Sequence, residues 1–262
     1  HYYWHNGAWT SSTAVRQRDG GADGYDCISH NGVSKNILSV GAVLADGSMS
    51  SFSGWGPSDD GRVKPDVVAK GVMVYSSGSG SNDQYVYMSG TSMSGPMVSG
   101  SIGLLLEHQE NLHPAQPLLS SSMKALVLHT ADDMISGAPG PDYRYGWGMM
   151  NTAGAAQLMS LNALDPGLHI REMVLNQGQQ LEIPLRASGD SPLRITMVWN
   201  DVPGTPPPAS LNPTSLMLVN DLDMRLASPV KKEQAYFSAT KTTYEPYILD
   251  PANPALPATP GA

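Results

Sequence analysis

The sequence predicts an α/β fold in which a parallel sheet packs against buried helices, followed by a small all-β domain. Two observations support the α/β part: short, continuous apolar runs bounded by turn residues, and a long helical stretch of apolar and small residues after Ser92. A third observation supports the all-β part, because the pattern beyond residue 168 changes to strand-like alternation of apolar and polar residues.

The apolar runs give the expected strands. Residues 37–43 form a run of the kind found in strands that are buried on both faces of a parallel sheet. Residues 67–69 and 72–75 predict two more short strands, separated by Lys70 and Gly71. Residues 1–36 mix Gly, Asp, Asn and Ser without a clear period, so we expect a surface loop there.

Three helices are expected. The first starts at Ser92, ends between residues 107 and 110, and has small or apolar residues nearly all round, so it should be buried inside the domain. Residues 118–130 predict the second helix, with Pro117 in its first turn, and residues 152–161 predict a shorter third helix.

The pattern changes after the third helix, and we place a domain boundary between residues 164 and 168. This divides the chain into a catalytic-type part, residues 1–165, and a β-sandwich or jelly-roll part, residues 166–262, which we expect to be truncated. Alternation predicts strands at residues 181–185 and 193–199, and further strands at residues 216–219 and 221–226.

Composition excludes several kinds of function. The formal net charge is −8 and no cluster of Lys and Arg occurs, which argues against a nucleic-acid partner. No apolar run approaches the roughly 18 residues needed to cross a bilayer, so we expect no membrane insertion. The single cysteine, Cys27, can form neither an internal disulfide nor a thiolate metal cage.

Ser92 is the residue whose setting predicts chemistry. It lies in residues 90–96, Gly-Thr-Ser-Met-Ser-Gly-Pro, where a glycine permits a tight turn before the expected helix. A serine hydroxyl becomes a useful nucleophile when a base removes its proton and amides face the developing oxyanion. Free amides and the positive dipole end of a helix would favour that negative charge. An N-cap serine is the structural alternative.

This motif resembles the Gly-Thr-Ser-Met-Ala-x-Pro nucleophile motif of the subtilisin-like serine peptidases, with Ser94 where that pattern usually has alanine. Four further blocks resemble the same family in the same order, and the good resemblance covers residues 28–160. These blocks are residues 35–42, 52–57, 64–71 and 145–148. Residues 168–250, especially 218–223, are similar to the β-barrel that follows the catalytic domain in some bacterial enzymes of this family.

The resemblance implies a serine endopeptidase that hydrolyses protein or peptide substrates through an acyl-enzyme on Ser92. It also implies that the Ser92 amide is an oxyanion donor, that the Thr91 hydroxyl helps, that the enzyme is secreted, and that no cofactor is required for the chemistry. The family's Asp and His motifs should precede Ser92, and neither is present. We therefore expect a fragment that lacks the N-terminal half of its catalytic domain and is inactive alone.

His30 is the candidate base among the histidines before Ser92, which are His1, His5 and His30, although a loop histidine is the favoured interpretation. The nearest aspartates to it are Asp19, Asp23 and Asp26. The four histidines after Ser92 are expected to be structural. They are His108, His113, His129 and His169.

Two alternatives remain beside the peptidase. The first is a noncatalytic subtilisin-fold scaffold or binding protein that lost its triad. The second, an esterase of the Gly-x-Ser-x-Gly kind, fails because Gly90 lies two residues before Ser92 but Ser94, not glycine, lies two residues after it. No catalytic metal is expected. Asp221 and Asp223 could hold structural calcium, although a solvated face or a turn network is the favoured interpretation.

Overall fold

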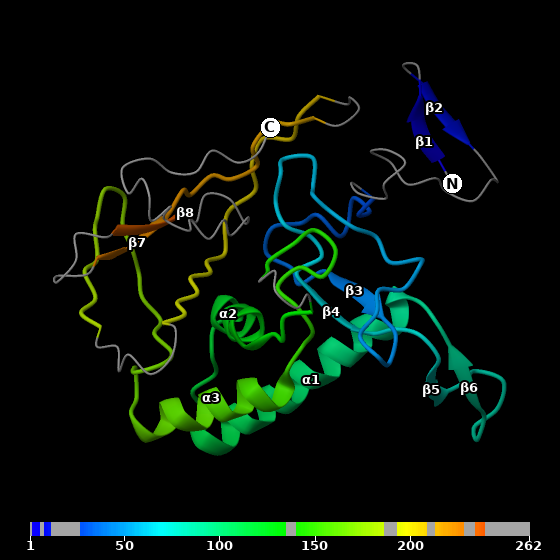
Figure 1. Ribbon diagram of the computed structural model, residues 1–262, viewed down its shortest axis with the longest axis horizontal. Coiled ribbons are helices and arrows are strands. Elements are labelled where there is room, and N and C mark those ends of the chain that lie inside the picture. The colour runs from blue at the N-terminus through cyan, green and yellow to red at the C-terminus, as the bar shows by residue number, and fades with distance from the viewer. Residues whose placement is uncertain are drawn as a thin grey trace, which may run out of the picture.

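The computed structural model describes residues 2–5, 8–11, 27–134, 140–185, 193–208, 213–227 and 234–238 (Figure 1). The first two elements are β1 (Tyr2–His5) and β2 (Ala8–Ser11), which pair antiparallel with Tyr2 opposite Ser11. The prediction of a loop throughout residues 1–36 was therefore wrong. The Asn-Gly dipeptide between these strands is typical of two-residue hairpins and is the signal that predicts them.

The central strands are β3 (Val40–Val43) and β4 (Val67–Lys70), which pair parallel with Val40 opposite Val67. The central residues of both strands are buried, which confirms the expected parallel pair buried on both faces. Helix α1 (Thr91–Leu112) packs against both strands, and Figure 1 shows it running beneath them.

A second pair of strands lies between β4 and α1. These are β5 (Val74–Ser77) and β6 (Tyr85–Met88), an antiparallel hairpin whose side chains are mostly exposed. The predicted strand at residues 72–75 thus begins two residues later than expected. Figure 1 shows the hairpin projecting away from the helices and from β3 and β4.

The other helices are α2 (Ser120–Thr130) and α3 (Thr152–Leu164). Both were predicted, but Pro117 precedes α2 and its N-cap Leu119 instead of lying in the first turn. Pro117 disfavours the helical conformation of Gln116, so α2 is not expected to extend upstream of the proline. Asn151 caps α3 by accepting a hydrogen bond from the Gly154 amide at 2.7 Å.

Helix α1 is buried on one face only, so the prediction of a helix buried all round was wrong. Val98 and Leu105 are buried, whereas Met97 is 46% exposed and Leu104 62% exposed. Among the described residues, β3, β4 and α3 contact α1, and the buried Val98 and Leu105, seven positions apart, lie on the same face of the helix. Composition predicts how a face could pack, but burial also needs a neighbouring element.

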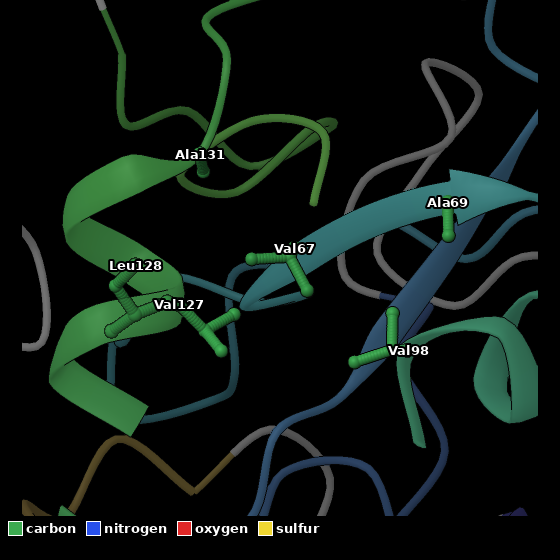
Figure 2. Close-up of a cluster of buried hydrophobic side chains, with 6 residues drawn as sticks. All are labelled: Val67, Ala69, Val98, Val127, Leu128 and Ala131. Atoms are coloured by element: carbon green, nitrogen blue, oxygen red, sulfur yellow. The ribbon is translucent and has the colours of Figure 1, made fainter. Parts of the chain in front are cut away.

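Two apolar clusters form the interior. Figure 2 shows the first, in which side chains of α1 and α2 converge on β4; its buried members are Val67, Ala69, Val98, Val127, Leu128 and Ala131. The second joins α1, α2 and α3, with Leu105, Met123, Leu126, Ala155 and Met159 buried. Side chains from all three helices and β4 therefore share a continuous packing environment.

A buried ionic network lies beside β4. Asp66 accepts hydrogen bonds from Lys64 at 2.5 Å and from the Ser39 amide at 2.7 Å, and Lys124 approaches its other oxygen at 3.1 Å. Lys124 also donates to the backbone carbonyl of Ile37 at 2.8 Å. Burial lowers the pKa of Lys64 to about 8, although the adjacent Asp66 carboxylate opposes this change.

The later part of the chain contains β7 (Asp223–Ala227) and β8 (Gln234–Ser238), which pair antiparallel. The strand predicted at residues 221–226 is shifted, and the predicted strands at residues 181–185, 193–199 and 216–219 are absent. Leu181, Leu185 and Leu216 are exposed, Leu216 to 71%, whereas Val198 is half-buried against the first apolar cluster. Alternation produces a strand only where a second strand supplies hydrogen bonds. The jelly roll and the boundary near residue 165 stay predictions.

Asp201 attaches this later part to the body. Its carboxylate accepts hydrogen bonds from Lys35 at 2.6 Å, from the Val219 amide at 2.9 Å, and from both the backbone and side-chain nitrogens of Asn220 at 2.9 Å. Burial alone would raise the pKa of Asp201, but these hydrogen bonds, that from Lys35 foremost, lower it to about 2.

Candidate active site

Ser92 is the second residue of α1, and its side chain is exposed. The strand β6 ends at Met88, Gly90 is the N-cap, and the helix begins at Thr91. The Met93 amide donates to the Gly90 carbonyl at 3.0 Å, which closes the first turn. The predicted placement of Ser92 at the start of a helix is confirmed.

Backbone contacts hold this helix start against the end of β4. The Gly90 amide donates to the Gly71 carbonyl at 2.8 Å, and the Gly71 amide donates to the Val43 carbonyl at 2.9 Å. A side chain at residue 71 would place its Cβ 2.7 Å from the Ala42 Cβ and 2.8 Å from the Gly90 carbonyl oxygen. Gly71 therefore permits the close approach that fixes the turn before Ser92.

Gly71 is a positioning residue for which the sequence alone predicted no role. Its only signal is the glycine that directly follows the strand residues 67–70. A glycine after a strand is common in turns, so the sequence did not distinguish a simple turn from a contact with residue 90.

Ser94 stabilises the same turn from its buried side. Its side chain is fully buried, and its hydroxyl donates to the Thr91 carbonyl at 3.0 Å. The hydroxyl is therefore satisfied within the helix and is turned away from solvent, whereas the Ser92 side chain is exposed. Within the segment 90–96 the structure distinguishes a structural serine from an accessible one.

The amides of Thr91 and Ser92 have no hydrogen-bond acceptor among the described residues. The first turn of α1 also contains no acidic side chain that could neutralise the helix dipole. An anionic oxygen placed there would meet free N–H donors and the positive end of a helix of 22 residues. The site can therefore stabilise negative charge beside the Ser92 hydroxyl, and Thr91, also exposed, lies next to it.

No hydrogen bond joins Ser92 to a histidine within the described part of the chain. His108 lies 16 positions further along α1, which corresponds to about 24 Å of helix, and bonds to the Ser160 hydroxyl. His30 is exposed in a turn. The structure thus does not bring His30 and Ser92 together by a hydrogen bond.

The other histidines and aspartates considered as triad members lie away from the start of α1 or outside the described residues. His113 is the C-cap of α1, His169 is exposed beyond α3, and His129 lies in the last turn of α2. The side chains of His1 and His5, and the residues Asp19, Asp23 and Asp26, lie outside the described residues.

His129 has a structural environment. Its Nδ1 lies 3.0 Å from the Thr196 hydroxyl, and its carbonyl accepts a hydrogen bond from Arg194 at 2.9 Å. Burial, with the nearby Arg194 and His169 charges, lowers the pKa of His129. The ring therefore helps to hold residues 193–200 against α2.

Within the described ranges, no group of three or more His, Cys, Asp or Glu side chains could hold a metal ion. Burial, and then the neighbouring Asp223 carboxylate, raise the pKa of Asp221. Calcium at Asp221 and Asp223 stays a prediction. None of the described helices is both long enough and apolar enough to span a bilayer.

Comparison with known proteins places the site in a family context. The model described as "Subtilase family" matches residues 20–148. The C5a peptidase of Streptococcus pyogenes is 41% identical over 88 residues, which cover 30% of this chain and 7% of that protein. The serine protease AprX of Bacillus subtilis is 33% identical over 128 residues, covering 41% of this chain and 29% of that protein.

A solved structure, the Clostridium perfringens CspB protease, is 27% identical with a TM-score of 0.48, covering 52% of this chain and 29% of that one. The chain thus spans a small part of the length of the relatives it matches. The matched segment includes β3, β4 and the turn that presents Ser92. Residues 20–148 are therefore similar in sequence to the subtilase family.

Proposed function

We propose that this protein is part of a serine endopeptidase and that Ser92 is its nucleophile. The observation that carries the proposal is the exposed Ser92 side chain at a helix start whose Thr91 and Ser92 amides are free among the described residues. The subtilase match and the relatives named as peptidase or serine protease support the same reaction class.

The proposed reaction is acyl transfer. The Ser92 Oγ attacks the carbonyl carbon of the scissile peptide bond, its proton passes to a general base, and the carbonyl oxygen becomes an oxyanion. The Ser92 amide donates to that oxyanion and the Thr91 hydroxyl assists. The base returns the proton to the leaving amine, and water then hydrolyses the acyl-enzyme.

The general base is the part that the described residues do not supply. In this proposal, a histidine and an aspartate outside them complete the triad, and a missing N-terminal half of the catalytic domain brings them. Without a base, the oxyanion donors give only residual rate, and loss of one triad member costs about 10⁴- to 10⁶-fold. The chain of 262 residues alone is then inactive or nearly so.

The substrate class follows from the proposed reaction, and the location follows from the family resemblance. The substrates are proteins or peptides, no cofactor takes part in the chemistry, and the enzyme acts outside the cell. Structural calcium at Asp221 and Asp223 would affect stability and not the chemical step.

Labelling with a fluorophosphonate tests the proposal, because this probe reacts with an activated serine. We expect the full-length protein to be labelled at Ser92 and to hydrolyse casein, and Ser92→Ala to abolish both. Ser94→Ala is the matched control, since it removes a buried hydroxyl of the same motif and should leave labelling in place. Casein hydrolysis that persists in Ser92→Ala would contradict the assignment.

A noncatalytic scaffold is the second candidate, favoured by the absence of a hydrogen-bonded base beside Ser92 in the part that the structure describes. The same probe separates the two. A full-length protein that is folded, contains no upstream Asp and His motifs, and is not labelled would be such a scaffold.

A further inference from the structure

Three tyrosines gather on one face of the β5–β6 hairpin. Tyr75 lies opposite Tyr87 in the ladder, and Tyr85 is two residues before Tyr87, so all three side chains lie on the same face. Tyr75 and Tyr85 are each 59% exposed and Tyr87 is 62% exposed. Large aromatic side chains that remain this exposed are a feature of binding surfaces.

The three rings hold one another in place. The Tyr75 and Tyr85 ring centroids are 5.4 Å apart with planes at 27°, and the Tyr75 and Tyr87 centroids are 4.8 Å apart at 38°. We call this group, Tyr75, Tyr85 and Tyr87, the tyrosine platform. Because the rings are already fixed by mutual contact, a ligand that binds them loses little side-chain entropy.

The platform is tied to the turn that carries Ser92. The Met73 amide donates to the Ser89 hydroxyl at 2.9 Å, and Gly90 bonds to Gly71, so both ends of the hairpin are fixed beside the start of α1. Tyr87 and Ser92 are five residues apart, which limits their Cα separation to about 18 Å. A polypeptide bound at Ser92 can therefore reach the platform within about five extended residues.

The charge of the hairpin indicates which kind of side chain the platform would bind. Asp83 is the one charged residue in residues 72–89. Its hydrogen bonds with Ser81 lower its pKa, so it stays a carboxylate at neutral pH. The faces of tyrosine rings carry negative potential and attract ammonium and guanidinium groups. Both features favour a basic side chain and disfavour an acidic one.

We propose that the tyrosine platform binds an Arg or Lys side chain of an extended polypeptide substrate near the bond that Ser92 cleaves. The relevance to cleavage rests on the proposed function. The binding itself does not, because the three rings and Asp83 all lie in the hairpin and involve no triad residue.

Peptide binding to the 262-residue chain tests this proposal. The probe is a fluorescein-labelled decapeptide of alternating Gly and Arg, and its match replaces each Arg by citrulline, which has nearly the same shape and no charge. In 150 mM NaCl we expect the Arg peptide to bind about tenfold more tightly. Equal affinities for the two peptides would overturn the proposal.

Two sets of variants separate recognition from folding. Replacing the three tyrosines by threonine keeps a strand-forming residue but removes the rings, and we expect the preference for Arg over citrulline to be lost. Replacing them by phenylalanine keeps the ring faces and should keep the preference. Asp83→Asn should weaken the preference for Arg, whereas Glu107→Gln, an exposed change on α1 with the same loss of charge, should leave it unchanged. Preference retained in the threonine variant would contradict the platform.

NMR keeps the test decisive if the threonine variant unfolds. In the unmodified chain, addition of the Arg peptide should shift the ring signals of Tyr75, Tyr85 and Tyr87 more than those of Tyr143 and Tyr145. Absence of this selective shift would overturn the proposal. Ser92→Ala should bind the peptide normally, so failure of catalysis and failure of the platform are distinguishable.

Discussion

The body of the molecule, residues 27–134 with 140–164, and the later part, residues 193–208 with 213–227, are held by different forces. In the body, side chains of β4 and three helices pack into two apolar clusters. In the later part, Leu216 and Val219 are 71% and 50% exposed, Lys35 and Asn36 of the body bond to Asp201, and Val198 packs against the first apolar cluster. Apolar packing dominates the first region, whereas polar contacts join Val198 in attaching the second.

The difference shows when an apolar pattern becomes an element. Residues 40–43 and 67–70 are each about four residues long, yet they form strands because they pair with one another and α1 covers them. Residues 193–199 have a clearer alternation but no strand partner in the described part of the chain. An apolar pattern indicates which face of a segment can be buried, and the elements that pack against the segment determine whether that face is buried.

The largest expected effect is on the packing of the body. Leu105→Ala removes a side chain that is 1% exposed and packs with Met123, Leu126 and Met159, so we expect a loss of about 3 kcal/mol in the free energy of unfolding. Urea denaturation followed by circular dichroism measures it.

Leu104→Ala is the matched control, because the adjacent leucine on the same helix is 62% exposed. We expect a change within about 0.5 kcal/mol. Equal losses in the two variants would mean that both faces of α1 are buried in solution and would break the description of the helix as one-sided.

A smaller effect is expected at Asp201. Asp201→Asn keeps the shape of the side chain but removes the charge that Lys35 contacts. The new side-chain amide also places an N–H donor against groups that are themselves donors, such as the Asn220 backbone amide. Because the charge-assisted hydrogen bonds of a buried carboxylate are lost, we expect a loss of about 2 kcal/mol in the free energy of unfolding.

Hydrogen exchange shows where that loss appears. Amides of residues 193–208 and 213–220 should exchange faster in Asp201→Asn, while those of β4 and α2 should keep their protection. The exposed Asp223→Asn change serves as a charge-matched control. If β4 and α2 lost protection to the same extent, the two regions would unfold as one unit and the comparison would fail.

The sequence was sufficient for the features that depend on local pattern. The strands near residues 40 and 67, the three helices and the place of Ser92 at a helix start all follow from apolar runs, a glycine turn and proline positions. The pairing of β1 with β2 was missed, although the Asn-Gly dipeptide between them is a local signal for a hairpin.

Features that depend on distant contacts were not predictable. The role of Gly71 depends on the carbonyl of Gly90, and the attachment of the later part depends on Lys35 meeting Asp201 across 166 residues. The tyrosine platform needs the register that places Tyr75 opposite Tyr87. No periodicity within one segment specifies such pairs.

The smallest expected effect concerns Lys64, the buried charged side chain of the body, and compares it with Asp201. The pKa of Lys64 is lowered to about 8 in the folded protein, whereas an unfolded lysine titrates near 10.4. Between these values the folded state binds fewer protons than the unfolded state. Stability conferred through Lys64 should therefore rise with pH, by about 1 kcal/mol between pH 8 and pH 9.

Lys64→Met isolates this contribution, because Asp66 keeps Lys124 and Ser39 as partners and all other titrating groups are shared. The difference in unfolding free energy between the unmodified chain and Lys64→Met, measured in urea at pH 7, 8 and 9, should move in favour of the unmodified chain above pH 8. If this difference did not change with pH, Lys64 would remain charged in the folded protein. The interior beside β4 would then stabilise a charged side chain, as the environment of Asp201 does.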